Sequence, residues 1–175
     1  MKLIESELMF IIDSFIPEPS QLYQILLNSI SWNDRIKSRK EASFGVPYNY
    51  SGAIWPEMAF PASLLPTLDL VSAQIGYRPN NCLALFYPNK NSTMGYHFDE
   101  IDQLASGTGI TVVSLGAERQ MSFQHQKSKE EEHYLLKNGS LLFMSAEMQS
   151  VWKHGLLADK TVTGGRISLA FRSVV

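Results

Sequence analysis

Two stretches of the chain repeat apolar residues at the spacing of an amphipathic helix. Within residues 20–30 the apolar positions lie three or four residues apart, and Pro19 and Ser20 are typical residues for a helix start. The second stretch covers residues 61–76 and ends at Gly76, a common helix stop. Residues 8–16 form an apolar run that predicts a strand. The first 80 residues therefore contain a predicted strand and two predicted helices, which we expect to pack on a core.

From residue 81 onward the helical period disappears, and short apolar or alternating segments follow one another. The predicted strands are residues 82–87, 95–99, 110–115, 120–125, 134–136, 140–144 and 165–174. Lys137-Asn138-Gly139 separates two of these strands, and Asn-Gly is the strongest short signal for a hairpin. Many short strands after two helices predict a mainly β protein of the α+β class, a double-stranded β-helix (jelly roll) with helices on one side.

We expect residues 1–175 to form a single domain, with the jelly-roll core in residues 81–175. Residues 1–80 would supply the strand, the two helices and, between the helices, a surface segment suited to act as a lid. Cys82 is the only cysteine, which excludes an intrachain disulfide and a thiolate zinc cluster. The net charge of −2 excludes a strongly basic nucleic-acid coat protein. The chain shows no signal peptide and no apolar stretch of membrane-spanning length, so we expect a cytoplasmic monomer.

His97 and Asp99 are two residues apart, so in an extended strand their side chains project from the same face. One imidazole and one carboxylate are two members of the facial triad that binds non-haem Fe(II). His154 is a candidate third ligand because a jelly roll brings distant strands together, although by itself its position favours a capped surface histidine. We interpret His125 and His133, which flank a charged stretch, as solvent-exposed loop residues.

Residues 166–172 alternate between two faces. Ile167, Leu169 and Phe171 share one face, and Arg166, Ser168, Ala170 and Arg172 share the other. Either this second face lies in water, or both guanidinium groups lie inside the barrel. Buried arginine requires an anionic partner, and arginine binds carboxylates with two parallel hydrogen bonds. A dicarboxylate bound beside a metal, such as 2-oxoglutarate, would satisfy both arginines.

Residues 32–50 combine positive charge with aromatic rings, namely Arg35, Lys37, Arg39, Lys40, Phe44, Tyr48 and Tyr50. Basic side chains can hold phosphates while an aromatic ring stacks on a base. The alternative is a solvated basic turn beside ordinary core aromatics. Gly45, Pro47 and the residues that follow Tyr50 predict turns, so we expect a hairpin-rich surface segment.

Taken together, these residues resemble the Fe(II)/2-oxoglutarate dioxygenases, and within them the AlkB-like nucleic-acid dealkylases. The family signature, HxD followed by H and by RxxxxxR, is met in order by His97-Phe98-Asp99, His154 and Arg166 to Arg172. The resemblance extends over about residues 39 to 173. It includes Arg39-Lys40-Glu41, Tyr50-Ser51-Gly52, Asn81-Cys82-Leu83, Ser114-Leu115-Gly116-Ala117 and Asn138-Gly139-Ser140.

The resemblance implies a role for each matching residue. His97, Asp99 and His154 would hold iron and so carry catalysis. Arg166 and Tyr87 would bind the distal carboxylate of 2-oxoglutarate, with Arg172 near the chelating end. Ser168, Leu83 and Met94 would complete that cosubstrate site. The family often has asparagine where this chain has Leu85 and Ser168, and leucine cannot replace the lost hydrogen bond. Residues implied to contact the substrate are Glu100, Asp102, Tyr48, Tyr50, Lys37 and Arg39.

The function implied by the resemblance is oxidative removal of N-alkyl groups from nucleic-acid bases, as in the repair of DNA alkylation damage. Fe(II), 2-oxoglutarate and O2 are the implied cofactors, and alkylated single- or double-stranded DNA, or RNA, is the implied partner. A base inside a duplex must be flipped out to reach such a pocket. Two alternatives stay open: the same oxygenase chemistry on a protein or small molecule, and a non-catalytic or zinc-binding jelly roll.

Overall fold

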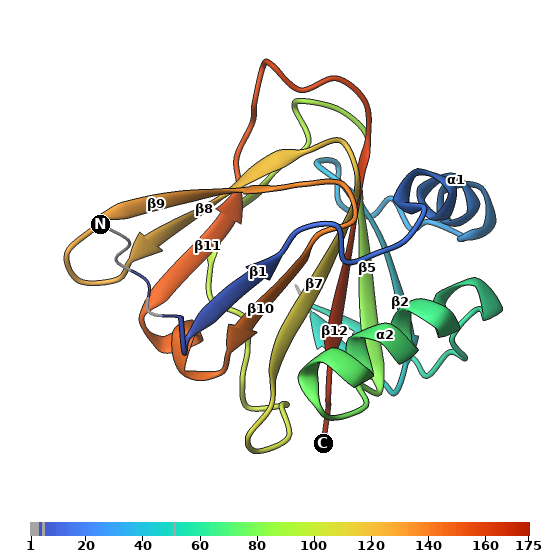
Figure 1. The fold of residues 1–175 in the computed structure, drawn as a ribbon, viewed down its shortest axis with the longest axis horizontal. Coiled ribbons are helices and arrows are strands. Elements are labelled where there is room, and N and C mark those ends of the chain that lie inside the picture. Colours follow the sequence, from blue (N-terminus) through green and yellow to red (C-terminus); the bar gives the residue numbers. More distant parts are fainter. Residues whose placement is uncertain (1–3, 5, 51) are drawn as a thin grey trace.

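A computed structural model describes residues 4, 6–50 and 52–175. Two antiparallel sheets form the centre of this described part (Figure 1). The larger sheet has the strand order β1 (Met9–Ile12), β10 (Leu141–Ser145), β7 (Gly109–Gly116), β12 (Arg166–Arg172), β5 (Asn81–Tyr87) and β2 (Lys40–Gly45). The smaller sheet has the order β6 (Met94–His97), β11 (Trp152–Leu156), β8 (Arg119–His125) and β9 (Glu131–Leu136). A separate hairpin is formed by β3 (Tyr48–Tyr50) and β4 (Ala53–Trp55).

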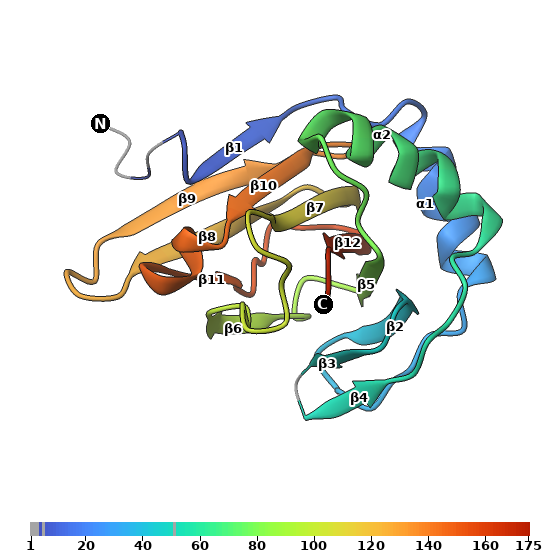
Figure 2. The ribbon, with the colours of Figure 1, turned by 90° about the horizontal axis from the view of Figure 1, so that it is seen from below.

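Helices α1 (Pro19–Ser29) and α2 (Leu65–Ile75) cover one face of the larger sheet, and the smaller sheet faces the other side (Figure 2). A proline lies in the first turn of each helix, where the missing N–H has no intrahelical partner to lose. Helix α2 ends at Gly76, whose φ of 82° is readily adopted by glycine. Short 3-10 turns precede α2 (Ala62–Leu64) and follow β10 (Glu147–Ser150). Both predicted helices are confirmed.

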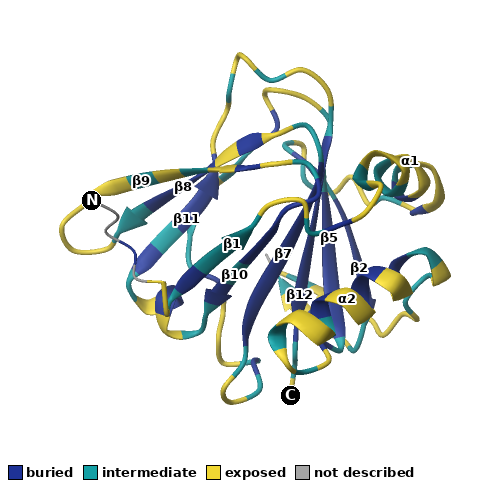
Figure 3. Ribbon diagram, viewed as in Figure 1, coloured by how far each residue is buried: buried dark blue, intermediate teal, exposed yellow. Residues whose placement is uncertain are grey.

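Two layers of apolar side chains form the core, one on each face of the larger sheet. The layer under the helices contains Leu26, Leu68 and Val71 together with Ile167, Leu169 and Phe171 of β12. The inter-sheet layer contains Leu83, Leu85, Val112, Phe123 and Ala170. Because both faces are covered, the central strands are buried along their length (Figure 3). The predicted mainly β jelly roll with helices on one side is confirmed.

The hairpin predicted at Lys137-Asn138-Gly139 is wrong. Strand β9 pairs with β8 in the smaller sheet, whereas β10 pairs with β7 and β1 in the larger one. Gly139 has a φ of 81°, so the turn residue behaves as expected, but its N–H donates to the carbonyl oxygen of Ser114. Asn138 Oδ1 also accepts a hydrogen bond from the backbone N–H of Gly116. These contacts hold the turn on β7, and the chain crosses there from one sheet to the other.

Several strand boundaries differ from the predictions. The first strand covers only Met9–Ile12 of the predicted residues 8–16, because the chain leaves the sheet before α1. Strand β6 ends at His97, so Asp99 lies in the following loop rather than in the strand. His125 and His133 belong to β8 and β9, where strand pairing orders them, and not to loops. The strand β11 that carries His154 was not predicted.

Part of the predicted surface segment belongs to the sheet. Residues 40–45 form β2 and pair with β5, since Ala42 and Phe44 bury their side chains under the helices. Only the hairpin of β3 and β4 stands apart, at the open side of the sandwich (Figure 2). None of the helices among the described residues is long and apolar enough to cross a membrane.

Candidate metal centre and cosubstrate chamber

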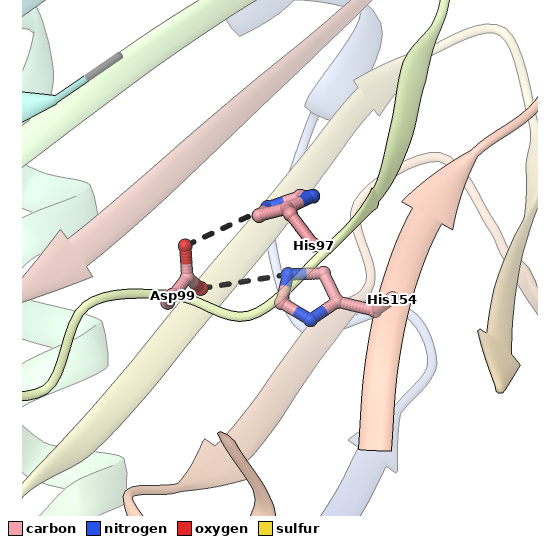
Figure 4. A group of neighbouring side chains, drawn as sticks. All are labelled: His97, Asp99 and His154. Atoms are coloured by element: carbon pink, nitrogen blue, oxygen red, sulfur yellow. Dashed lines mark ion pairs between the residues drawn. The ribbon is translucent and has the colours of Figure 1, made fainter. Parts of the chain in front are cut away.

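Strand pairing brings the two candidate histidine ligands together. His97 and His154 are direct partners across β6 and β11, and their ring centroids are 4.4 Å apart. Asp99 Oδ1 lies 3.7 Å from His97 Nε2, and Asp99 Oδ2 lies 3.5 Å from His154 Nε2 (Figure 4). One ligand atom from each residue lies within 4.8 Å of the others. Although Asp99 has left the strand, the loop turns its carboxylate back between the two rings.

The surroundings of this cluster orient its atoms. His97 Nδ1 lies 2.9 Å from the carbonyl oxygen of Gly95, which leaves Nε2 to face Asp99. The backbone N–H of Asp99 donates to Gln149 Oε1 at 3.0 Å, and Arg172 Nη2 donates to Asp99 Oδ1 at 3.2 Å. Burial alone would raise the pKa of Asp99, but Arg172 and the two histidines hold it well below its usual range.

Two neutral imidazoles and one ionised carboxylate are the donor set of a facial Fe(II) site. Burial lowers the pKa of His154 despite the opposing effect of Asp99, so its ring is neutral as a metal ligand must be. Three ligands from one side leave further coordination positions for a cosubstrate. The residues therefore fit a divalent metal ion, and His97, Asp99 and His154 are the residues that would hold it.

The two arginines of β12 both lie inside the barrel. Arg172 is paired with Asp99, and its guanidinium carbon lies 4.8 Å from the centroid of the Tyr48 ring. Arg166 is 1% exposed, and its contacts are with uncharged oxygens: Ser114 Oγ at 2.8 Å, Ser168 Oγ at 3.3 Å and Leu136 O at 3.5 Å. Burial lowers the pKa of Arg166 to about 10. No carboxylate pairs with it among the described residues, so this cation is suited to an anionic ligand.

A narrow chamber of about 40 Å³ joins these two regions. Asp99, the two histidines and Arg172 border it, and so do Tyr87 and Ser168, the neighbours of Arg166. Its remaining walls are mostly apolar, formed by Leu83, Leu85, Met94, Val112, Met121 and Ala170. The unbranched side chains of Met94 and Met121 can adjust to a guest. An extended molecule with an apolar middle and two anionic ends matches this arrangement.

An open cleft of about 350 Å³ lies over the metal centre. It is lined by Arg39, Tyr50 and the run from Met94 to Glu100, so it shares His97 and Asp99 with the chamber. Arg39 is buried against Glu41 at 3.2 Å, and its Nη2 donates to the Tyr50 hydroxyl at 3.4 Å. Glu100 is exposed at the rim. A substrate entering here would meet an aromatic ring, a guanidinium and a carboxylate beside the metal.

Three predicted substrate residues lie elsewhere. Lys37 is exposed, Asp102 is exposed in a turn, and neither lines the cleft. Tyr48 is 1% exposed beneath Arg172, and burial raises its pKa. Tyr50 and Glu100 are the predicted substrate residues that reach the cleft together with Arg39.

Sequence reasoning missed the residues that support the site. Gln149 and Ser114 hold Asp99 and Arg166, and Gln103 links Asn49 of the β3–β4 hairpin to Glu100. Polar residues at these positions are ordinary in composition, and their partners Asp99, Arg166 and Asn49 lie 50 to 54 residues away in the chain. These residues are recognised by their burial beside an assigned ligand, and burial cannot be read from the sequence.

Replacing Gln149 by leucine removes the acceptor of the Asp99 N–H while keeping an apolar side chain of similar size. We expect Fe(II) affinity to fall by about 10- to 100-fold, because partners that orient metal ligands contribute that much. Anaerobic Fe(II) titration followed by tryptophan fluorescence measures it. Unchanged affinity would show that the loop holds Asp99 without this hydrogen bond.

The sequence profile of the 2OG-Fe(II) oxygenase superfamily matches residues 18–172. The chain belongs to this superfamily. It is an AlkB-like member, as the family resemblance predicted, and Fe(II), 2-oxoglutarate and O2 are the cofactors that the family implies. The triad of His97, Asp99 and His154 gives a candidate iron site among the described residues.

Curated relatives carry names of two kinds. Uncharacterized protein R406 of Acanthamoeba polyphaga mimivirus is 26% identical over 85% of this chain and 80% of its own length. The DNA oxidative demethylases ALKBH2 of Bos taurus and Homo sapiens are 31% and 30% identical over 78% of this chain. The chain spans only 53% and 57% of the length of these two mammalian proteins.

A solved structure titled OsALKBH1 superposes with a TM-score of 0.71 and 15% sequence identity. The superposition covers 94% of this chain and 96% of the OsALKBH1 chain. At this identity the match supports the fold.

Proposed function

We propose that the chain removes N-alkyl groups from nucleic-acid bases by oxidation, in the manner of DNA alkylation repair. The observation that carries the proposal is the open cleft, which places Tyr50, Arg39 and Glu100 around the candidate iron ligands. An aromatic face can stack on a base, and a carboxylate can accept hydrogen bonds from its edge. The name of the mammalian relatives, DNA oxidative demethylase, agrees with this substrate class.

In this proposal the two ends of the chamber have separate tasks. His97, Asp99 and His154 hold Fe(II), which with 2-oxoglutarate and O2 supplies the oxidising chemistry. Arg166, Tyr87 and Ser168 hold the distal carboxylate, and Arg172 keeps Asp99 ionised and oriented near the chelating end. Leu83 and Met94 enclose the carbon chain of the cosubstrate and keep water away from it.

The cleft opens to solvent, whereas a base inside a duplex is stacked and paired. The substrate base must therefore leave its stack, or belong to a single strand, before its alkyl group can reach the metal centre. Gln103 holds the hairpin that carries Tyr50 against the loop that carries Glu100, so the two sides of the cleft keep a fixed position relative to each other.

Mass spectrometry of methylated oligonucleotides tests the proposal. The protein with Fe(II) and 2-oxoglutarate is expected to release unmodified base from at least one of methylated single- or double-stranded DNA or RNA. The matched control is the same oligonucleotide without the methyl group, which should not stimulate succinate formation. Succinate formation that ignores every methylated oligonucleotide would point instead to a protein or small-molecule substrate.

Replacing Lys37 by alanine is expected to weaken oligonucleotide binding equally across sequences and to lower the slope of log K against log salt by about one. Lys37 is exposed, whereas its neighbour Arg39 is tied to Glu41, so Lys37 is the cleaner probe of phosphate contact. Fluorescence anisotropy at several salt concentrations measures both values. An unaltered slope would remove residues 35–40 from the account of nucleic-acid binding.

A further inference from the structure

Arg119 is a second buried cation near the distal end of the chamber, and it has no part in the proposed chemistry. It begins β8 and is 1% exposed. Its Nη1 donates to the carbonyl oxygen of Ser92 at 2.9 Å, and its Nη2 donates to the carbonyl oxygen of Leu157. Ser92 lies in the loop between β5 and β6, and Leu157 lies in the loop between β11 and β12. One guanidinium therefore ties two loops together.

These two loops connect the two ends of the chamber. The first leads from Tyr87, the last residue of β5, to Met94, the first residue of β6. The second leads from Leu156, the last residue of β11, to Arg166, the first residue of β12. Tyr87 and Arg166 are direct partners in the larger sheet, and Met94 and Leu156 are partners in the smaller one.

The smaller sheet carries His97 and His154, whereas the larger sheet carries the distal pair Tyr87 and Arg166. The separation between metal ligands and distal pair therefore depends on how these loops hold the two sheets together. The loops lie beside each other at the top of Figure 1, where Asp159 N–H also donates to the Lys90 carbonyl oxygen at 3.2 Å. Arg119 adds two charge-assisted hydrogen bonds across the same junction, so it fixes the spacing more firmly.

Charge points to the same end of the molecule. Neither Arg119 nor Arg166 contacts a carboxylate within the described part of the chain. Burial lowers the pKa of both guanidinium groups, and the positive charge of Arg119 adds to the lowering at Arg166. The charge of the Asp159 carboxylate raises the pKa of Arg119 without an ion pair between them, whereas Arg166 has no such carboxylate nearby among the described residues. The buried cation Arg166 therefore favours an anion at this end of the chamber.

We propose that Arg119 is a positioning residue that sets the length of the dicarboxylate accepted by the chamber. The inference rests on the proposed placement of the 2-oxoglutarate distal carboxylate at Arg166 and Tyr87. In this inference, Arg119 holds the two sheets at the spacing at which the five-carbon acid reaches both the metal ligands and Arg166. Without its two hydrogen bonds the loops can separate, and a longer acid can reach both ends.

Calorimetric titration of the anaerobic Fe(II) holoenzyme compares 2-oxoglutarate with 2-oxoadipate, one methylene longer, and oxaloacetate, one methylene shorter. The wild-type protein is expected to prefer 2-oxoglutarate by at least about tenfold, the low end of what one methylene contributes. Arg119→Lys keeps the charge, but one ammonium does not span both carbonyl oxygens as the guanidinium fork does. In that variant the preference over 2-oxoadipate is expected to fall to about threefold or less, below that one-methylene range.

Arg78→Lys is the matched control, because Arg78 is an exposed arginine that pairs with Asp69 and does not line the chamber. It should keep the wild-type preference. An Arg119→Lys protein that folds and keeps the preference would overturn the proposal, as would one that loses affinity for all three acids by the same factor. Equal affinity of the wild-type protein for the three acids would also overturn the proposal, because no length selection would remain to explain. The calorimetric titration contains no nucleic acid, so its result does not depend on dealkylation. A failure to dealkylate oligonucleotides would refute the proposed function and leave this proposal standing.

Discussion

Replacing His97 by alanine is expected to abolish Fe(II)-dependent turnover of 2-oxoglutarate while the protein stays folded. His97 is one of the three candidate ligands, and its loss leaves a histidine and a carboxylate that no longer define a facial site. The fall in turnover should exceed about 100-fold, the upper range for residues that only support a ligand. Its side chain is 25% exposed, so removing the ring leaves no sealed cavity, and the free energy of unfolding should change by less than about 1 kcal/mol.

Turnover is measured as succinate formed, and folding by thermal denaturation of the metal-free protein. His133→Ala is the matched control, because this exposed histidine of β9 lies outside the cluster and should retain wild-type turnover. Activity retained in His97→Ala would end the triad assignment. A protein that melts far below the wild type would instead assign His97 a structural role.

Replacing the two arginines of β12 by methionine is expected to give opposite effects on stability. Arg166 is a buried cation with uncharged partners, so Arg166→Met should leave the metal-free protein as stable as the wild type or more stable. Arg172 is paired with the buried Asp99, so Arg172→Met leaves a carboxylate without its cation and should cost about 3–5 kcal/mol. The two variants have the same side chain on the same strand face, which makes each the control of the other.

The Arg166→Met variant is also expected to change 2-oxoglutarate binding without changing the oligonucleotide requirement. Arg166→Met should weaken 2-oxoglutarate binding by about 2–5 kcal/mol, the cost of removing one partner of a buried charge pair. Its oligonucleotide requirement should stay near the wild-type value, because Arg166 does not line the cleft. Denaturant titration and 2-oxoglutarate titration provide the measurements. If the 2-oxoglutarate and oligonucleotide requirements rose equally, Arg166 would not be the carboxylate clamp.

The predictions that succeeded rest on local periodicity. Apolar spacing in residues 20–30 and 61–76 gave both helices, because a helix buries a stripe that its own sequence defines. Alternation along β12 separated Ile167, Leu169 and Phe171 from the two arginines, and the strand keeps that division. The pattern left open whether the face with the two arginines is exposed to solvent. In the structure both faces of the larger sheet are covered by segments distant in sequence, so the arginines are buried.

The predictions that failed concern partners distant in sequence. The Asn138-Gly139 turn has the conformation that its residues favour, but hydrogen bonds to β7 send the chain into the other sheet. His125 and His133 look like loop residues beside charged neighbours, yet pairing of β8 with β9 orders them. The segment around Lys40 reads as a surface turn, yet it completes the sheet beside β5. In each case the partner strand, and not the local residues, determined the outcome.

By itself the sequence determined the donors of the site: His97 and Asp99 two residues apart, a later His154, and two arginines on one strand face. It also carried the resemblance that identified the family. The tertiary structure supplied the physical reason why His154 rather than His125 or His133 joins the pair, because the register of β11 against β6 places it opposite His97. Such pairing depends on contacts between residues far apart in the chain. For the same reason the chamber, the cleft and the junction held by Arg119 could not be predicted from the sequence, since residues from distant segments form each of them.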